Sequence, residues 1–148
     1  MRVYEAELTD RCVGTLIALS EQWAAEGSCW GYRANSRADI EGNRVFLAEG
    51  DEGVLGYLFG HGSAAKKASS VMPEGTPYFE VEEIYVLPEA RSRGIGRALF
   101  RYAEDAVRGE AEYVMLSTAT KNWRAILHFY VDELGMDFWN ARLFKRIE

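Results

Sequence analysis

Hydrophobic and polar positions alternate over the first residues of the chain, and a helical period follows. The alternation predicts a half-buried strand over residues 2–8. Apolar side chains then recur at helical spacing from Val13 to Ala24, and Gly27 is a suitable stop for that helix. The next stretch is irregular and aromatic, and it favours one short helix near residues 36–41.

The middle of the chain has the pattern of a hairpin followed by a strong strand. Residues 44–49 and 54–60 are apolar runs on either side of a Gly-Asp-Glu-Gly turn, which is typical of a hairpin. Residues 60–77 are small, polar and rich in turn formers, and we expect a functional loop there. Residues 78–87 then predict a strand that Pro88 closes.

The second half of the chain alternates helical and strand patterns. A helix is predicted from about Gly94 to Gly109, and residues 112–117 form a short apolar run typical of a buried strand. A second helix is predicted over residues 122–134, and two short strands within residues 136–147. Because hairpins and βαβ crossovers are combined in this order, we expect a mixed sheet and an α/β (α+β) fold class.

Composition narrows the function classes. The 148 residues fit one domain, spanning 1–148, and the net charge of −6 argues against a nucleic-acid partner. Two cysteines, Cys12 and Cys29, and two histidines predict neither a disulfide framework nor a metal site. We find no apolar leader and no run of transmembrane length, so we expect a cytoplasmic protein without a membrane partner.

Two glycines and three arginines stand between the strand and the helix of the second half, in Arg91-Ser92-Arg93-Gly94-Ile95-Gly96-Arg97-Ala98. A helix N-terminus carries unpaired N–H groups and the positive end of the helix dipole, and together they favour an anion. Gly94 and Gly96 leave room for a phosphate to reach this backbone. Arg91, Arg93 and Arg97 can add charge-assisted hydrogen bonds.

Three kinds of phosphate loop can be compared with this turn. A P-loop requires a Gly-Lys-Ser/Thr ending that the chain lacks, and a Rossmann fingerprint requires a third glycine where Leu99 stands. The pyrophosphate pattern [Q/R]-x-x-G-x-[G/A] is met by Arg91, Gly94 and Gly96. Taken alone, these six residues fit a tight turn with solvated arginines equally well.

The longer stretch EVEEIYVLPEARSRGIGRALF resembles the GNAT acetyltransferase family, in its fourth strand, pyrophosphate loop and third helix. A second block agrees: Asn122, Ala125 and Tyr130 have the family's spacing, although Met136 replaces the usual Phe after Gly135. The order of the predicted elements also agrees, so the resemblance covers nearly the whole chain. It implies a GNAT-like mixed, splayed central β-sheet flanked by helices.

The resemblance implies that the anion is the pyrophosphate of acetyl-CoA, which serves as a co-substrate without a metal. It implies that the exposed strand backbone pairs with the pantetheine amides, where the fourth and fifth strands diverge. It also implies that one asparagine bonds the pantetheine arm. The coenzyme-binding residues implied in this way are Ile84, Tyr85, Val86, Arg91, Arg93, Gly94, Ile95, Gly96, Arg97, Ala98 and Asn122.

Transfer of an acyl group to an amine requires a base and an acid. An alkyl ammonium has a pKa of about 10.4, so it must lose a proton before attack, and the departing thiolate must gain one. The resemblance places Tyr130 beside the sulfur as the acid. Strand alternation places Glu80 and Glu82 on one face and Glu83 on the other. We rank Glu82 first and Glu80 second as the base, with a water chain as the alternative.

The resemblance also implies that the backbone N–H of Val86 stabilises the oxyanion of the reaction. Cys12 lies in the first predicted helix and Cys29 in a loop, and we identify no basic partner for either in the sequence, so we expect direct attack in a ternary complex without a covalent intermediate. The predicted function is therefore an acyl-CoA-dependent N-acetyltransferase. A non-catalytic acyl-CoA-binding module and a Rossmann-type nucleotide-binding domain are the alternatives.

The predicted acceptor is a small-molecule or peptide amine. The family's acceptor region corresponds here to the following residues and to the loop from Gly60: Glu26, Trp30, Tyr32, Arg33 and Phe79. Aromatic side chains with carboxylates suit a cation, and they suit a hydrophobic lid or a dimer surface as well. The apolar C-terminal strands make a homodimer a further possibility.

Overall fold

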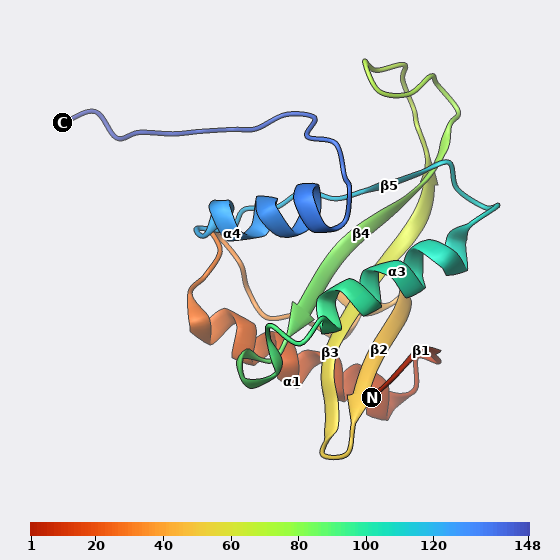
Figure 1. Cartoon of the computed structure of the whole chain (residues 1–148), viewed down its shortest axis with the longest axis vertical. Coiled ribbons are helices and arrows are strands. Elements are labelled where there is room, and N and C mark those ends of the chain that lie inside the picture. The colour runs from red at the N-terminus through yellow and green to blue at the C-terminus, as the bar shows by residue number, and fades with distance from the viewer.

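A computed structural model describes all residues 1–148, and its centre is a five-stranded sheet. The strands follow one another in the order of the sequence, and the first three pairings are antiparallel while the last is parallel. Figure 1 shows the strongly twisted sheet, whose strands are β1 (Arg2–Ala6), β2 (Arg44–Gly50), β3 (Gly53–Ala64), β4 (Pro77–Val86) and β5 (Tyr113–Met115). The predicted mixed sheet is confirmed.

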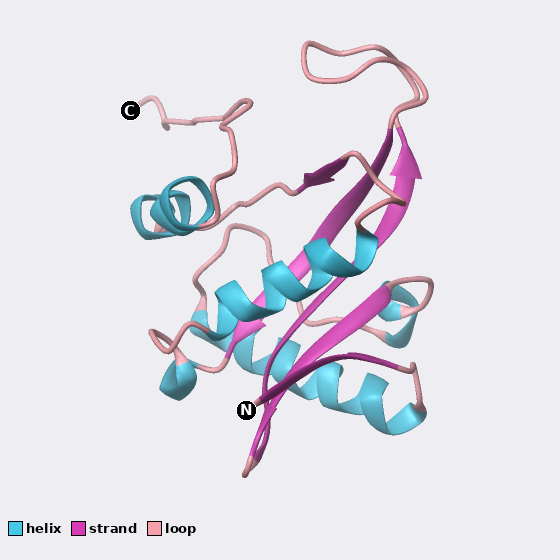
Figure 2. Cartoon of the chain, turned by 45° about the vertical axis from the view of Figure 1, so that its right-hand side comes forward, coloured by secondary structure: helices cyan, strands magenta, loops and turns pink.

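Helices cover both faces of the sheet, as Figure 2 shows. The helical elements are α1 (Asp10–Glu26), α2 (Arg37–Ile40), the 3₁₀ turn η1 (Pro88–Ala90), α3 (Ile95–Val107), α4 (Trp123–Leu127) and the π-helical segment η2 (His128–Glu133). Two apolar clusters divide the core. One packs Val13 and Leu16 of α1 against Tyr57 and Phe59 of β3, and the other packs Leu99 of α3 and its neighbours against the opposite face.

The fourth and fifth strands diverge soon after they meet. β5 pairs only with residues 78–80 of β4, whereas β4 continues to Val86 along β3. One edge of β4, over residues 81–86, therefore has no neighbouring strand. This confirms the splayed sheet that the resemblance implied, and it leaves backbone groups open to a ligand.

Several element boundaries differ from the prediction. β3 continues to Ala64 because its polar end still finds a partner in the start of β4, so the expected loop shrinks to residues 65–76. β5 is shorter than predicted and only half-buried, because β4 turns away from it. The predicted helix over 122–134 exists, but its second half is π-helical. The two strands predicted within 136–147 are wrong, since this segment pairs with no strand of its own chain.

Candidate active site

The turn before α3 presents a row of unpaired backbone donors. Ser92 has a φ of 63° and Gly94 a φ of 78°, so the backbone passes twice through the left-handed region before the helix begins. The six N–H groups from Ser92 to Arg97 donate no hydrogen bond within the protein, and the first helical bond runs from Ala98 N to Gly94 O at 3.0 Å. Such alternating turns and helix starts form concave anion sites.

The arginines of this turn have different partners. Arg91 donates from Nε to Val86 O at 3.0 Å, and its guanidinium lies 2.8 Å from the Glu26 carboxylate at the end of α1. Arg93 donates to Glu89 O at 3.0 Å and is otherwise exposed, and Arg97 is exposed in the first turn of α3. Arg91 therefore ties the turn to α1, and the other two cations remain accessible.

The open edge of β4 leads away from this turn. Leu87 N donates to Leu55 O of the neighbouring β3 strand at 2.9 Å. Because alternate residues of an antiparallel strand face the same neighbour, Tyr85 also directs its backbone toward β3, whereas Ile84 and Val86 direct theirs toward the open edge. Of the three strand residues that the resemblance implied, two are thus oriented for a ligand, and of these Val86 offers its N–H, because its carbonyl already accepts from Arg91 Nε.

The π-helical segment η2 approaches the start of α3. A Cβ on Gly96 would lie 3.2 Å from Phe129 Cζ and 3.8 Å from Val86 Cγ2. Gly96 therefore has a packing role that the sequence reading did not include, because a side chain there would require the Phe129 ring to shift. Ile95, which follows the turn, is buried in the α3 core.

The neighbour of Phe129, Tyr130, is the one residue of η2 that is buried. Burial, and to a smaller degree Cys29, raises the pKa of Tyr130 to about 12, so its phenol stays protonated at neutral pH. Its hydroxyl bonds no other protein group, which leaves the proton free for a ligand. Asn122 precedes α4 and is exposed, with its backbone N–H bonded to Thr120 Oγ1 at 3.2 Å.

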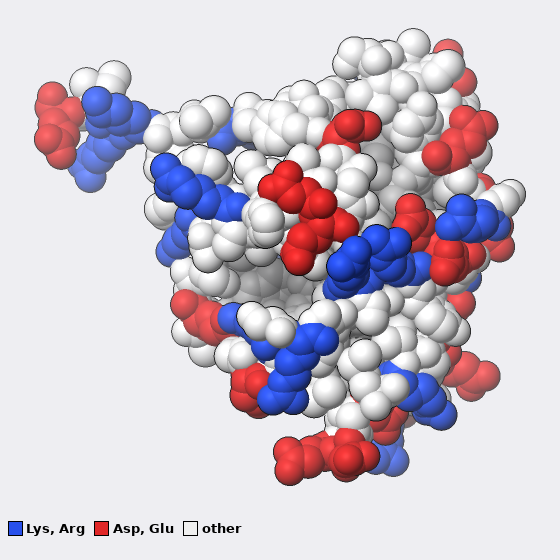
Figure 3. Space-filling model, viewed as in Figure 1, with Lys and Arg blue, Asp and Glu red and all other residues white.

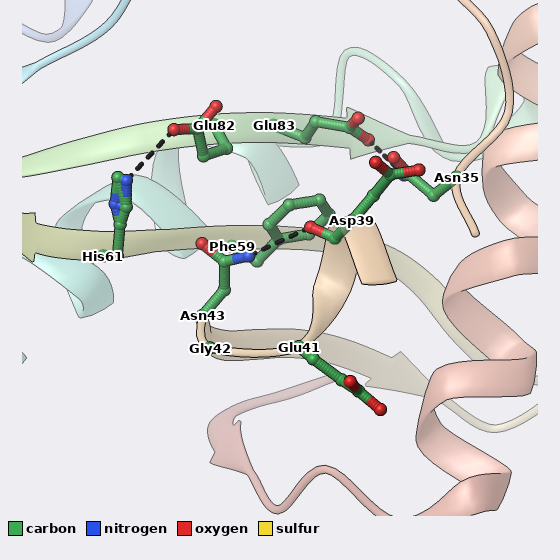
Figure 4. Close-up of a pocket in the computed structure, with 9 residues that line it drawn as sticks. All are labelled: Asn35, Asp39, Glu41, Gly42, Asn43, Phe59, His61, Glu82 and Glu83. Atoms are coloured by element: carbon green, nitrogen blue, oxygen red, sulfur yellow. Dashed lines mark hydrogen bonds and ion pairs between the residues drawn. The ribbon is translucent and has the colours of Figure 1, made fainter. Parts of the chain in front are cut away.

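A β-bulge changes the directions of the glutamates on β4. The register between β3 and β4 shifts after Phe59, so that Glu82 is an extra residue between the partners of Phe59 and Gly60. The expectation that Glu83 points away from Glu82 is therefore wrong. Both line one open pocket of about 410 Å³, which Figure 4 shows.

Three donors converge on a single oxygen of Glu83. Tyr57 Oη donates at 2.8 Å, Asn35 Nδ2 at 2.9 Å and Tyr32 Oη at 3.0 Å, all to Oε1. Burial nevertheless raises the pKa of this carboxyl, against the lowering effect of these bonds. Sequence reasoning missed this cluster because its members are distant in the sequence and the bulge has no signature of its own.

Glu82 has a different neighbourhood on the other side of the pocket. His61 of β3 lies 3.2 Å from it, between Nε2 and Oε1, and the Nδ1 atom of His61 is buried without a partner. Glu80 lies opposite His61 in the register, and burial together with the nearby charge of Glu82 raises its pKa. The two glutamates ranked as the base thus share one environment with a histidine that the sequence reading left without a role.

The five residues expected around the acceptor do not form one cavity. Glu26 is engaged by Arg91, Arg33 by Asp39, and Tyr32 by Glu83. Trp30 contacts Lys121 and Phe144, and Phe79 is buried on the α3 face. The acidic pocket lies instead between the end of α2 and the β3–β4 bulge, where its other lining residues are Asn35, Asp39, Glu41, Gly42, Asn43 and Phe59.

Comparison with known proteins agrees with this geometry. The model of the acetyltransferase (GNAT) family matches residues 16–136, so the chain belongs to that family and the predicted resemblance is confirmed. Among curated proteins, none matches the sequence.

Solved structures share the fold at low sequence identity. A transcriptional regulator from Bacillus halodurans is 17% identical with a TM-score of 0.71, over 99% of this chain and 100% of the other. The aminoglycoside N-acetyltransferase AAC(6')-Iy in complex with CoA is 17% identical with a TM-score of 0.67, over 99% of both chains. An acetyltransferase from Trypanosoma brucei is 16% identical with a TM-score of 0.67, over 99% of this chain and 100% of the other.

No helix of this protein combines the length and the apolar character that a membrane-spanning helix requires.

Proposed function

We propose that this protein transfers an acetyl group from acetyl-CoA to a primary amine of a small cationic acceptor, by direct attack in a ternary complex. The observation that carries the proposal is the continuity of two unpaired backbone surfaces. The six free N–H groups from Ser92 to Arg97, in the loop and the first turn of α3, adjoin the open edge of β4, and that edge runs past the glutamates of the bulge. A diphosphate, an amide-bearing arm and a thioester fit this sequence of surfaces.

In this proposal the turn binds the pyrophosphate. The N–H groups from Ser92 to Arg97 are the donors, and Arg93 and Arg97 are accessible cations beside them. The backbone of Ile84 binds the pantetheine amides as an added strand would, and the Val86 carbonyl joins it when Arg91 Nε gives up its bond to that oxygen. Asn122, exposed before α4, is assigned to the same arm.

The proton transfers are assigned to two side chains. Glu82 accepts a proton from the acceptor ammonium, directly or through water, and passes it to solvent. The neutral amine then forms a bond to the thioester carbon while the carbonyl electron pair moves to oxygen, and its nitrogen loses a second proton to Glu82 as the intermediate becomes the amide. The Val86 N–H stabilises the oxyanion. When the carbon–sulfur bond breaks, its electron pair stays on sulfur and Tyr130 donates a proton to it. Because the pKa of Tyr130 is raised to about 12, the tyrosinate regains a proton from water at neutral pH.

The class of acceptor is inferred from the pocket at the bulge. Asp39, Glu41, Glu82 and Glu83 line it, and no lysine or arginine does. A molecule with several ammonium groups would place one amine for reaction and pair the others with these carboxylates. The aminoglycoside N-acetyltransferases among the proteins of the same fold are consistent with such an acceptor.

The proposal is tested by release of free CoA thiol from acetyl-CoA in the presence of an amine panel. The panel should contain diamines, amino sugars and peptides, and, as matched controls, the same scaffolds with a single amine. We expect thiol release with the multiply charged amines and a higher KM for the singly charged ones. Binding of acetyl-CoA without thiol release from any amine would instead favour a non-catalytic acyl-CoA-binding module.

A further inference from the structure

His61 lies in the acidic pocket but has no part in the proposed acetyl transfer. It belongs to β3, opposite Glu80, and its Nε2 atom lies 3.2 Å from Oε1 of Glu82. Figure 4 shows the side chains of His61 and Glu82 pointing toward each other from neighbouring strands. Both are partly exposed, at 38% and 44%, so a ligand in the pocket can reach the carboxylate. The structure thus joins a histidine to the carboxylate that is assigned as the base.

Two local features of the backbone bring this pair together. The β-bulge inserts Glu82 as an extra residue of β4, so that its side chain lies beside the face that His61 occupies on β3. Gly60 precedes His61, and a Cβ there would collide with the carbonyl oxygen of Glu80. The absence of a side chain at Gly60 therefore lets β4 approach β3 next to His61. The contact follows from the pairing of two strands and not from the chance meeting of two surface side chains.

The two ring nitrogens of His61 have different surroundings. Nε2 contacts Glu82, whereas Nδ1 is buried and has no hydrogen-bond partner. In an imidazolium both nitrogens carry protons, so Nδ1 would be a charged N–H group buried without an acceptor. In a neutral ring only one nitrogen carries a proton. The neutral ring with its proton on Nε2 is therefore the form that offers Glu82 a donor and leaves no buried N–H unsatisfied.

A neutral partner distinguishes Glu82 from carboxylates that arginines bind. Arg91, for example, lies 2.8 Å from the Glu26 carboxylate, and Figure 3 shows basic and acidic side chains side by side over the face that it views. No lysine or arginine lines the pocket at the bulge. A guanidinium holds a carboxylate in its charged form and so weakens it as a base, whereas a neutral N–H orients it with a smaller loss of basicity. These surroundings suit a carboxylate that must accept protons.

We propose that His61 is a positioning residue for Glu82, and the inference rests on the proposed function, in which Glu82 is the base. The neutral ring donates from Nε2 to Oε1 and so fixes the orientation of the carboxylate, while Oε2 remains to accept protons from the acceptor amine. His61 keeps its own proton throughout, because the protons of the amine pass through Glu82 to solvent. A carboxylate that is oriented before the acceptor binds has less freedom to lose during proton transfer.

Nuclear magnetic resonance tests the protonation state of His61 without any reaction. The chain has two histidines, so His61→Gln identifies the ring signals of His61 in a proton–nitrogen correlation spectrum by removing them. We expect a neutral His61 ring with its proton on Nε2 at neutral pH, and a shift of its signals in Glu82→Gln. His128 contacts Asp132 on the surface, so its signals should not move in Glu82→Gln. An imidazolium at His61, or a proton on Nδ1 alone, would overturn the proposal.

Kinetics with acetyl-CoA and the best diamine of the amine panel tests the positioning role. His61→Leu removes the donor, whereas His61→Gln keeps an amide N–H near the place of Nε2. We expect kcat to fall about 10–100-fold in His61→Leu at an unchanged KM for acetyl-CoA, and to stay within about 3-fold of the parent in His61→Gln. His128→Leu alters the other, exposed histidine and should change neither constant. Equal losses in His61→Leu and His61→Gln, with both variants folded, would overturn the role of the donor.

A double-mutant cycle separates this inference from the proposed function. Because His61 acts through Glu82, His61→Leu should cost no further activity when Glu82→Gln is already present. An additional loss of the same size in the double variant would overturn the positioning role, while the loss in Glu82→Gln alone would still support the base. Full activity of Glu82→Gln would instead overturn the assignment of the base and the positioning role with it, although the Nε2–H signal of His61 in the parent would be as expected.

Discussion

At the scale of single residues, Glu83 shows how a carboxylate can be held by neutral groups alone. Its Oε1 atom accepts from two tyrosine hydroxyls and one amide, and no arginine or lysine approaches it. Burial raises the pKa of this carboxyl above its ordinary value of 4.5. The folded protein therefore binds the proton more tightly than the unfolded chain does, so this group destabilises the fold increasingly as the pH rises from about 4.5 through the folded pKa.

Glu83→Gln should remove this pH dependence, because the amide oxygen can still accept the three bonds without a charge. We expect the melting temperature of the variant to rise relative to the parent between pH 4.5 and neutrality, measured by thermal denaturation at several pH values. Glu112→Gln, which changes an exposed acid, serves as the control and should show no such trend. A constant difference for Glu83→Gln at all pH values would contradict the raised pKa.

The phenol of Tyr130 allows a sharper test of the proposed chemistry. Tyr130→Phe keeps the buried ring and removes the proton donor, so kcat should fall by about 100-fold, the low end of general-acid effects. The affinity for acetyl-CoA should not change, as calorimetry would show. Tyr102→Phe removes an exposed hydroxyl from α3 and should be neutral. Full activity of Tyr130→Phe would remove this residue from the mechanism.

At the scale of elements, the turn that leads into α3 requires glycine at two positions, for two different reasons. Gly94 has a φ of 78° with open space around it, so its constraint is conformational, whereas Gly96 faces Phe129 and its constraint is steric. Gly109, at the other end of α3, has a φ of 88° and also has open space. The two ends of one helix thus offer a matched pair of left-handed glycines.

Gly94→Asp and Gly109→Asp should cost similar stability, since both place a side chain in the left-handed region. Only Gly94→Asp adds a negative charge beside the free N–H groups. We expect its dissociation constant for CoA, measured by calorimetry, to rise about 100-fold through repulsion of the phosphates, and that of Gly109→Asp to stay within a few-fold of the parent. Equal affinities in the two variants would show that the diphosphate lies elsewhere.

Helix ends could be predicted from the sequence, because residues next to the end determine them. Gly27 ends α1 in the left-handed conformation, as the pattern indicated, and Thr9 caps the start of that helix through a bond from Cys12 N at 3.1 Å. The bulge at Glu82 could not be predicted in the same way. It depends on the register in which β3 pairs with β4. The register with the bulge and the register without it both agree with the alternation of apolar and polar residues in each strand. The acidic pocket follows from that bulge, so it too was missed.

At the scale of the whole molecule, the C-terminal segment shows that a sequence can have a strand pattern without a neighbouring strand to pair with. Its alternation predicted strands within 136–147, and the structure has none there. A strand pattern states that one face must be buried, but it does not state which edge will bury it, since strand pairing is a long-range choice. The same reasoning explains β5, whose apolar run predicted burial that the divergence from β4 does not provide.

Binding of the coenzyme should be visible in the stability of the whole fold, because the proposed site joins the turn before α3, β4 and α4. A ligand at 100 times its dissociation constant stabilises the native state by about 2.7 kcal/mol. For a chain of this size that corresponds to a rise in melting temperature of about 5–10 °C. Acetyl-CoA should produce this shift, and NAD and ATP at the same concentration should produce less. A larger shift with NAD would favour a dinucleotide site and would exclude the proposed use of the open β4 edge, since NAD has no pantetheine arm to pair with it.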